Sequence, residues 1–193
     1  MFNILAAGPA LLASLLVSGS AAPAPPPDGK TTVDVVYANG SGCPPGALKA
    51  VARKGTITIA FEDFTASSGG DALDYRKNCQ VGLNVKVPKG YTYAVSRVTV
   101  GGTGKLGPGD SGSVRALMYF QGMTETVEQG REINGPLNGK WQFDSRIGPK
   151  SRVYHPCGAK RYLNVNLDLR AGSGDGSVSV GGRLGLEFTR KKC

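Results

Sequence analysis

The sequence predicts an all-β fold, namely one antiparallel β-sandwich of about ten strands, stapled by two disulfides. Apolar and polar residues alternate at period two over several short stretches, which is typical of strands that bury one face. Glycine, proline, asparagine and serine separate those stretches, as turns do in sandwiches and barrels. Four cysteines follow a secretion signal in this chain of 193 residues, and an even number of cysteines in an oxidising compartment predicts disulfides.

Three stretches alternate most regularly: residues 79–88, 161–170 and 183–189. Their apolar positions share one face and are predicted to point into the core; they are Val81, Leu83, Val85, Val87, Leu163, Val165, Leu167, Leu169, Leu184, Leu186 and Phe188. The opposite face of the second stretch carries the row Asn164, Asn166 and Asp168. Because an alternating strand can bury only one face, this row predicts a solvated sheet surface.

Weaker signals predict further strands at residues 33–37, 56–61, 91–100, 113–120, 124–128, 141–146 and 178–180. Residues 47–54 contain Ala, Leu and Lys, which favour a helix, but Gly55 can make a tight return into the next strand and favours a strand instead. Pro88–Gly90 predicts a turn that joins its two neighbouring strands in a hairpin. Residues 101–113 and 172–176 are rich in glycine and predict loops, the second one before a last hairpin.

The first segment predicts a secretion signal. Residues 2–17 are apolar, and small residues follow up to Ala22, which is the pattern of a signal and its cleavage zone. A buried core helix is the alternative, but the proline-rich run that comes next cannot continue a helix. We therefore expect a signal peptide at 1–22, a Pro-rich linker at 23–30 and a single sandwich domain at 31–193. No later stretch is apolar over 18 residues, which predicts no membrane insertion.

Three disulfide pairings are open to the four cysteines. The pairing of Cys43 with Cys79 and of Cys157 with Cys193 is favoured, because each bridge spans 36 positions and stays within one half of the chain. Loop entropy predicts a stabilisation of roughly 3–4 kcal/mol from each bridge. A zinc site is disfavoured, because the sequence has no C-x-x-C motif and its single histidine is His155.

The formal net charge is +9, from 23 basic and 14 acidic residues. Such a surface attracts polyanions without specificity. The basic residues are scattered, apart from the tight run Arg190–Lys192, so solubility is the simpler interpretation of the charge. The expected partners are a polysaccharide, another acidic polymer or a host protein, without specific nucleic-acid binding, and the protein is expected to be a monomer.

One motif resembles a catalytic one. Gly109–Ser113 is similar to the segment around the nucleophile of chymotrypsin-like proteases. A serine nucleophile needs a base within hydrogen-bond reach, and that family has its histidine well before the serine, whereas His155 comes after it. A glycine-rich loop is therefore the preferred interpretation of the motif.

The carboxylates of the chain show no sequence spacing that is typical of a glycoside hydrolase or of a calcium site. Glycoside hydrolysis needs two carboxylates at a defined separation, for which Glu62, Asp63, Asp74 and Asp168 are formally available. A calcium site could form around Asp71 and Asp74, or at Asp175 in its glycine-rich loop, but no EF-hand or repeat spacing is present. The sequence therefore predicts no catalytic residue, no metal and no cofactor.

Aromatic faces offer rigid contact area for sugars, and the candidates for such a platform are Tyr91, Tyr93, Tyr119, Trp141 and Tyr162. The alternative is that these rings fill the core of the sandwich. Asn164 and Asn166 could hydrogen-bond a glycan from the polar row. The weak binding candidates are thus Trp141, Tyr91, Tyr93, Asn164 and Asn166. Asn39 begins a glycosylation sequon, although Asn39-Gly40 is also an ordinary turn signal.

Several segments together resemble an uncharacterised family of small secreted proteins from fungi and actinobacteria, domain of unknown function 4360. The segments that carry the resemblance are residues 34–46, 74–80, 88–94, 119–123, 135–137, 156–158 and 163–166, with the closing Cys193. The resemblance implies secretion and a frame of four cysteines. It implies no activity, so no catalytic or binding residue is transferred from it.

These observations favour a non-catalytic extracellular protein that binds a wall polymer, a glycan or another acidic surface. A secreted effector that acts on a host or competitor protein is one alternative. A carbohydrate-active hydrolase is the other, and it requires the scattered acids to meet in one cleft.

Overall fold

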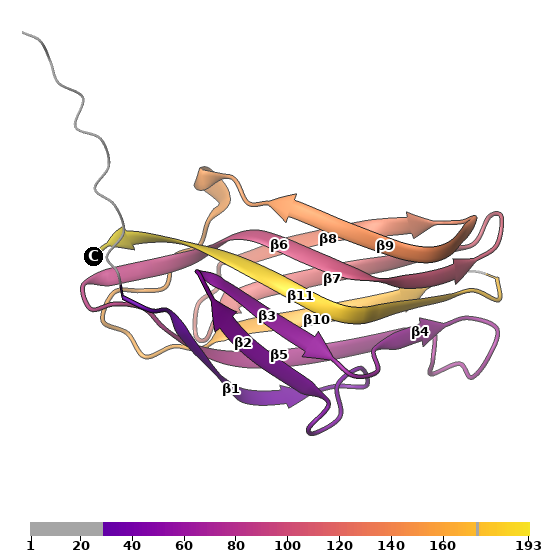
Figure 1. The fold of residues 1–193 in the computed structure, drawn as a ribbon, viewed down its shortest axis with the longest axis horizontal. Coiled ribbons are helices and arrows are strands. Elements are labelled where there is room, and N and C mark those ends of the chain that lie inside the picture. Colours follow the sequence, from indigo (N-terminus) through magenta and orange to yellow (C-terminus); the bar gives the residue numbers. More distant parts are fainter. Residues whose placement is uncertain (1–28, 173) are drawn as a thin grey trace, which may run out of the picture.

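In the computed structural model, which describes residues 29–172 and 174–193, two antiparallel β-sheets pack face to face (Figure 1). The β10 sheet has the strand order β1 (Thr32–Asn39), β5 (Arg76–Lys86), β10 (Leu163–Ala171), β7 (Ser111–Phe120), β8 (Thr126–Asn134). The β11 sheet has the order β2 (Leu48–Arg53), β3 (Thr56–Phe61), β11 (Ser177–Lys192), β6 (Tyr91–Leu106), β9 (Leu137–Arg146), and the short β4 (Thr65–Ser67) also pairs with β11. The all-β sandwich is therefore confirmed.

Helix is almost absent from the described residues, where the one helical element is the 3₁₀ turn Pro149–Ser151. None of the described helical structure is long and apolar enough to cross a membrane. The predicted boundaries of the signal peptide and the linker fall almost entirely on residues before Gly29, outside the described chain. These boundaries remain a prediction.

The core lies between the two sheets and is built from the alternating residues. Leu167 of β10 and Leu186 of β11 are fully buried, and so are the inward residues Val165, Leu169 and Leu184 of the same strands. Burial of one such side chain stabilises the fold by about 1.5–3 kcal/mol. The inward residues predicted for β5, β10 and β11 all lie in this core or pack against it, so the period-two pattern identified the buried face correctly.

The Pro88–Gly90 turn is present, but it does not form a hairpin. The Tyr91 amide donates to the Pro88 carbonyl at 3.2 Å, and Gly90 has φ +81°, a left-handed conformation that glycine adopts without strain. However, β5 pairs with β1 and β10, whereas β6 pairs with β11 and β9. The turn therefore passes from one sheet to the other, and the apolar faces of β5 and β6 lie in opposite layers of the sandwich.

The glycine-rich stretch 101–113 is mostly strand rather than loop. β6 continues to Leu106 and pairs with β9 from Arg97 to Leu106, and the turn is confined to residues 107–110. A side chain at Gly104 would lie 2.9 Å from the Leu137 side chain, so glycine provides space here. The predicted last hairpin is likewise a single strand, β11, with a register shift between Ser179 and Arg183.

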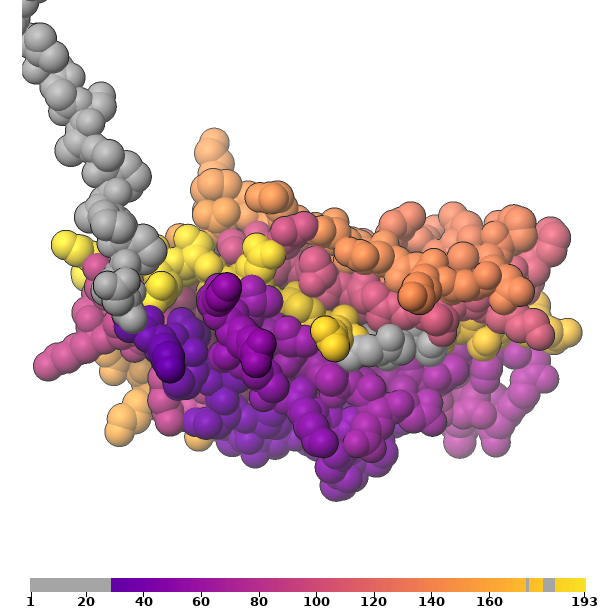
Figure 2. All heavy atoms as spheres, in the orientation of Figure 1, coloured from indigo at the N-terminus to yellow at the C-terminus, as the bar shows by residue number. Residues whose placement is uncertain are grey.

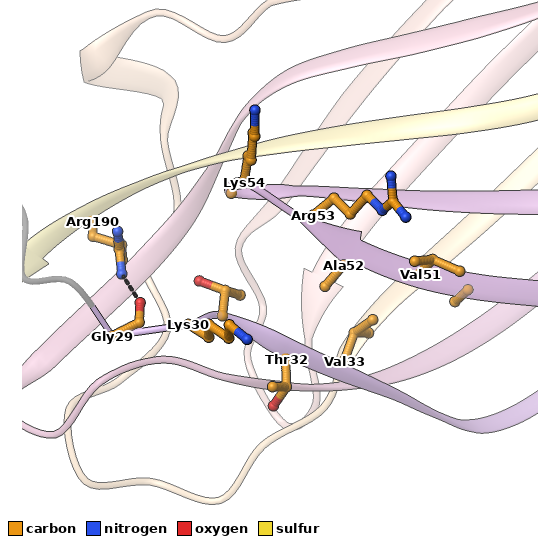
Figure 3. Close-up of a pocket in the computed structure, with 12 residues that line it drawn as sticks. Gly29, Lys30, Thr32, Val33, Val51, Ala52, Arg53, Lys54 and Arg190 are labelled. Carbon is orange, nitrogen blue, oxygen red and sulfur yellow. Dashed lines mark hydrogen bonds between the residues drawn. The ribbon is translucent and has the colours of Figure 1, made fainter.

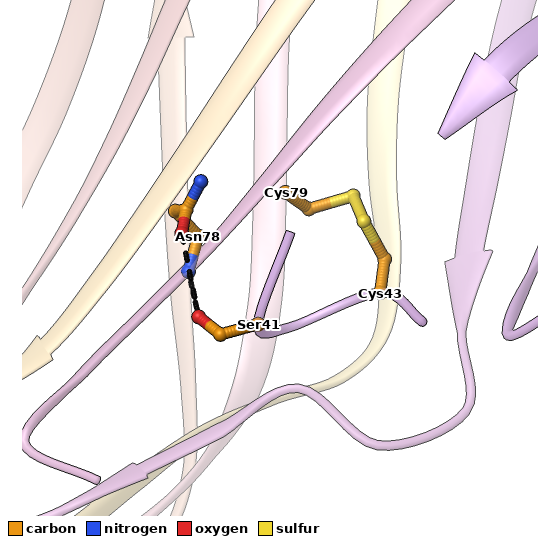
Figure 4. The surroundings of a disulfide bond; sticks show 4 residues. All are labelled: Ser41, Cys43, Asn78 and Cys79. Atoms are coloured by element: carbon orange, nitrogen blue, oxygen red, sulfur yellow. Dashed lines mark hydrogen bonds between the residues drawn. A yellow bond between two sulfur atoms is a disulfide. The ribbon is translucent and has the colours of Figure 1, made fainter. Parts of the chain in front are cut away.

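Both disulfides of the favoured pairing are present. Cys43 follows β1 and joins Cys79 of β5, beside a hydrogen bond from the Asn78 amide to the Ser41 hydroxyl at 3.2 Å (Figure 4). Cys157 lies in an irregular segment and joins Cys193, the residue after β11. The first bridge is buried inside the sandwich, whereas the second ties an outer segment to the end of a strand.

We predict that replacing Cys43 and Cys79 together by alanine lowers the free energy of unfolding by about 3 kcal/mol, because the unfolded chain regains the entropy of a long loop. Urea unfolding of the oxidised proteins measures the change. The pair Cys157→Ala and Cys193→Ala is the matched control, since its loop has the same separation of 36 residues. A loss well below about 1 kcal/mol for both pairs would contradict the entropic account.

Candidate functional site

A groove lies between the edge strands β1 and β2, which belong to different sheets. Its volume is about 800 Å³. Residues 29–33 form one wall, residues 50–55 form the other, and Arg190 of β11 lies at its end (Figure 3). Lys30, Arg53 and Lys54 contribute the charged side chains of the two walls, so segments far apart in the sequence bring cations together here.

A second hollow of about 650 Å³ continues this groove toward the end of β11. It shares Lys54 and Arg190 with the first and adds Lys191 and Lys192. We refer to the two hollows together as the cationic groove, which is defined by Lys30, Arg53, Lys54, Arg190, Lys191 and Lys192. Within residues 29–172 and 174–193, no aspartate or glutamate lines either hollow and none of the six cations forms a salt bridge.

Two of these cations have other contacts. The Arg190 guanidinium donates to the Gly29 carbonyl at 3.2 Å, and the Lys191 ammonium lies 3.9 Å from the centre of the Tyr154 ring. Both contacts leave the positive charge uncompensated. The first described residues of the chain and the last part of β11 therefore meet at this end of the molecule, where indigo and yellow atoms adjoin in Figure 2.

The outer face of the β11 sheet extends the positive surface. The strand register places two acids, Asp144 and Glu187, and seven cations on this face. The cations are Lys49, Arg53, Arg97, Lys105, Lys140, Arg146 and Arg183. Arg97 bridges the two acids, and its hydrogen bond to Asp144 holds the pKa of that carboxyl below its ordinary value. On the β10 sheet, by contrast, Arg76 and Arg170 pair with Asp168, Lys86 with Asp34 and Arg115 with Glu128. The charge excess is thus one-sided.

A third cavity, of about 600 Å³, lies on the other side of the 88–90 turn. We call it the aromatic cavity, because Tyr91, His155 and Tyr162 line it, with Lys89, Lys160 and Arg161 among its charged residues. The structure thus brings the sequence candidates Tyr91 and Tyr162 together with Tyr93. His155, set aside in the sequence as a poor catalytic base, is their neighbour.

Tyr93 forms the floor of this cavity and belongs mainly to the core. Only 1% of its surface is exposed, and its ring stacks on His155 with centroids 5.2 Å apart. Burial raises the pKa of Tyr93, so the hydroxyl stays protonated. Among the described residues this hydroxyl has no hydrogen-bond partner, and an unpaired buried donor destabilises the fold.

The segment that covers Tyr93 is irregular but firmly held. The His155 amide donates to the Tyr93 carbonyl at 2.9 Å, and the Thr92 hydroxyl donates to the His155 carbonyl. The Cys193 amide donates to the Gly90 carbonyl at 2.9 Å, and the Cys157–Cys193 disulfide fastens the segment to β11. A rigid scaffold that positions an irregular segment is a common arrangement at binding sites.

The polar row of β10 is not the solvated surface that the alternation predicts. Asn164 is 4% exposed, because the Tyr37 ring lies across Gly82 and its hydroxyl donates to the Asn164 side-chain oxygen at 2.5 Å. Gln80 donates to the Tyr119 hydroxyl at 3.2 Å. Each contact reaches across one intervening strand, β5 in the first case and β10 in the second. Tyr37 and Gln80 carried no sequence signal because their partners are far away in the chain.

Three further sequence candidates, Trp141, Asn166 and Asn39, lie in different surroundings. Trp141 is buried at the edge of the core, where its indole nitrogen donates to the Thr103 carbonyl at 3.0 Å. Little of the Trp141 surface is exposed, although the residue lines a shallow hollow of about 480 Å³, and its contact with a sugar stays a prediction. Asn166 lies beside Asn164 on β10, and its buried side-chain oxygen has no partner among the described residues. Asn39 is exposed at the end of β1, and its glycosylation remains a prediction.

The serine motif does not meet its histidine. Ser111 begins β7 near the Leu106 end of β6, whereas the His155 amide binds Tyr93 near the other end of β6. The Phe120 ring, at the other end of the ten-residue β7, lies 5.3 Å from the His155 ring, so the rise of a strand separates Ser111 from His155 by roughly 30 Å. A serine and a base at that distance cannot act together.

The acidic candidates are dispersed over the described surface. Asp74 pairs with Lys77 and Asp168 pairs with two arginines, while Glu62 and Asp63 lie exposed after β3. Asp71 accepts a hydrogen bond from the Leu73 amide in its own loop. No group of three histidine, cysteine, aspartate or glutamate side chains among the described residues is placed to hold a metal ion.

Comparison with known proteins gives a family and one curated relative. The profile of the family described as Domain of unknown function (DUF4360) matches residues 29–191. An "Uncharacterized secreted protein" of Arthroderma benhamiae is 32% identical over 151 residues, which cover 76% of this chain and 61% of that protein. The chain thus spans about three fifths of the length of this relative.

Comparison with solved structures gives only distant similarity. TmCBM61 in complex with β-1,4-galactotriose is 15% identical, with 81% of this chain and 88% of that chain covered and a TM-score of 0.29. A structure titled "CBM4 structure and function" is 15% identical, with 78% of each chain covered and a TM-score of 0.25. An empty particle of Cowpea Mosaic Virus has a TM-score of 0.30 at 12% identity, covering 91% and 88% of the two chains. Scores this low carry no argument about function.

We predict opposite effects from two hydroxyl deletions. Tyr37→Phe removes the donor to the buried Asn164 side chain and should lower the free energy of unfolding by about 1 kcal/mol. Tyr93→Phe removes a buried hydroxyl without a partner among the described residues and should leave stability unchanged or raise it. Thermal unfolding of both variants measures the changes, and destabilisation by Tyr93→Phe would mean that this hydroxyl is paired in solution.

We also predict that the stability of the protein falls as the pH drops below about 6.5. Burial lowers the pKa of His155 below its ordinary value, so the unfolded chain binds the proton more readily than the folded one in that window. His155→Gln should remove this part of the pH dependence, measured by urea unfolding at pH 7 and pH 5. An NMR titration that places the pKa of His155 above its ordinary value would refute the prediction.

Proposed function

We propose that this chain, which belongs to the DUF4360 family, is a non-catalytic protein that binds an acidic polysaccharide through the cationic groove. The protein is secreted: its relative is a secreted protein, and its two disulfides fit an oxidising compartment. Polymers that carry carboxylates or sulfates are available outside cells. Binding one of them requires a surface of concentrated positive charge.

One observation carries the proposal. Six cations line the cationic groove, and no aspartate or glutamate is among the described residues that line it. Like charges held together repel one another, so this arrangement costs stability unless an anion neutralises it. A hollow lined by one sign of charge also concentrates the field and attracts anions to itself. The paired charges of the β10 sheet show that neutral surface is attainable in the same fold.

The arrangement of the cations favours an extended polymer over a compact anion. Arg53 belongs both to the groove and to the outer face of the β11 sheet. Lys49 lies on the same face of β2, about 13 Å further along the strand. Lys49 of β2 and Arg183 of β11 both pair with Ala60 of β3, one on each side of that strand. A chain with repeated negative charges can contact the groove and this row together, which a single small anion cannot do.

The two alternatives receive less support. A hydrolase needs its carboxylates in one cleft, whereas Asp74, Asp168 and Glu62 lie on different elements with separate contacts. An effector that binds a host protein could use the same cations, so it differs from the proposal only in its partner. The following binding experiment separates these two possibilities.

We expect the secreted protein to bind immobilised polygalacturonate at low ionic strength and to release it as salt rises, because salt screens exposed charges. The triple variant Arg53→Gln, Lys54→Gln and Lys192→Gln should weaken binding about tenfold, since each lost contact contributes up to about 1 kcal/mol. Biolayer interferometry over a salt series measures both effects.

The matched control carries Arg76→Gln, Arg115→Gln and Lys150→Gln, three exposed cations outside the cationic groove. It loses the same formal charge and should keep nearly full affinity. If both triple variants lose the same affinity for polygalacturonate, net charge alone is responsible for binding. That result would contradict the proposal that the cationic groove is the binding site. Absence of binding to every acidic polysaccharide at low salt would overturn the proposed function and favour a protein partner.

A further inference from the structure

The aromatic cavity has the dimensions of a small-molecule site. Its volume of about 600 Å³ lies within the range of roughly 300–1,000 Å³ that is typical of ligand pockets. Its lining mixes aromatic rings with a few charged groups, whereas the cationic groove is lined mainly by charge and small residues. The two sites therefore offer different chemistry at the same end of the molecule.

The side chains around the cavity suit a sugar with a carboxylate. The rings of Tyr91 and Tyr162 are half-buried, so each presents a flat surface and a polar hydroxyl, which match the carbon face and the hydroxyls of a pyranose. Arg161 supplies a planar guanidinium, the group best matched to a carboxylate. One of its nitrogens donates to the Gln121 carbonyl at 2.5 Å, and this carbonyl lies outside the lining of the cavity. Lys89 and Lys160 add exposed positive charge.

The cavity is also held in shape by the fold itself. The segment around His155 is anchored to β6 by one backbone hydrogen bond and by one hydrogen bond from the Thr92 hydroxyl, and it is also held by the Cys157–Cys193 disulfide. Its histidine stacks on the buried Tyr93 ring. A ligand that enters such a site does not have to order the segment, and this saves the entropy that a flexible loop would lose on binding.

Tyr91 connects the aromatic cavity to the cationic groove. It lines both the aromatic cavity and the second hollow of the groove. In the pairing of β11 with β6, Lys192 lies opposite Tyr91 and Lys191 lies opposite Thr92. We infer that the aromatic cavity holds one terminal uronic acid residue of the polysaccharide whose following residues lie in the cationic groove. This assignment rests on the proposed function and adds recognition of a chain end to it.

NMR titration of the full secreted protein with galacturonate tests the cavity separately from the groove. We expect millimolar binding, as befits so small a ligand, with shifts concentrated at residues 154–162 and 89–93. Galactose has the same ring without the carboxylate, and acetate has the carboxylate without the ring. Both should bind more weakly than galacturonate. Equal binding of galactose, or shifts confined to other residues, would overturn the assignment.

Variants then identify the contacts. Tyr162→Ala should weaken galacturonate binding about threefold to tenfold through loss of the ring contact, and Lys89→Gln with Lys160→Gln, both at exposed positions, should weaken it by a similar factor without disturbing the core. Tyr75→Ala is the matched control, because Tyr75 is 51% exposed and lines none of the described cavities around Tyr91. Unchanged binding in both the Tyr162 and the lysine variants would refute the inference.

The failure of the inference can be told apart from the failure of the proposed function. The groove variant with Arg53, Lys54 and Lys192 replaced should lose affinity for polygalacturonate and keep its galacturonate shifts. If the protein binds the polymer but galacturonate produces no shifts, the cavity assignment is wrong and the groove stands. If the polymer fails to bind at low salt, the proposed function itself is wrong, and the chain-end assignment falls with it.

Discussion

The antiparallel pairing of β6 with β11 is the contact on which the rest of the molecule depends. The two strands have 16 residues each and pair from Tyr91 with Lys192 to Lys105 with Ser177. Their inward residues fill the centre of one wall of the core. The same register brings the basic end of β11 beside Tyr91, so the geometry that buries Leu184 and Leu186 also builds the candidate binding end.

Much of this architecture could be predicted from local pattern. The strand at residues 56–61 has the bounds of β3, and the apolar positions of β10 are all buried, because alternation reports burial directly. Residues 101–106 were misassigned because glycine in a strand can serve close packing, here against Leu137, and a turn-forming residue does not distinguish the two uses. β4 has only three residues, too few for alternation to register.

The candidate site was much less predictable, for a physical reason. Of the six cations in the groove, only the Arg190–Lys192 run stands out in the sequence, whereas Lys30, Arg53 and Lys54 join it through the packing of separate strands. The same limit applies to Asn164, whose covering ring belongs to Tyr37, 127 positions away. Periodicity identifies which face of a strand is apolar, but the partners of its polar face depend on sheet order, which no local pattern contains.

Gly29 and Cys193, the first and last described residues, lie at the same end of the sandwich as the cationic groove and the aromatic cavity. An affinity tag or fluorescent protein fused at either position would therefore sit over these hollows and could mask them or supply charges of its own. The turn at residues 107–110, at the far end of β6, is the better place for a label or for attachment to a sensor surface, because it leaves the cationic end open to solvent.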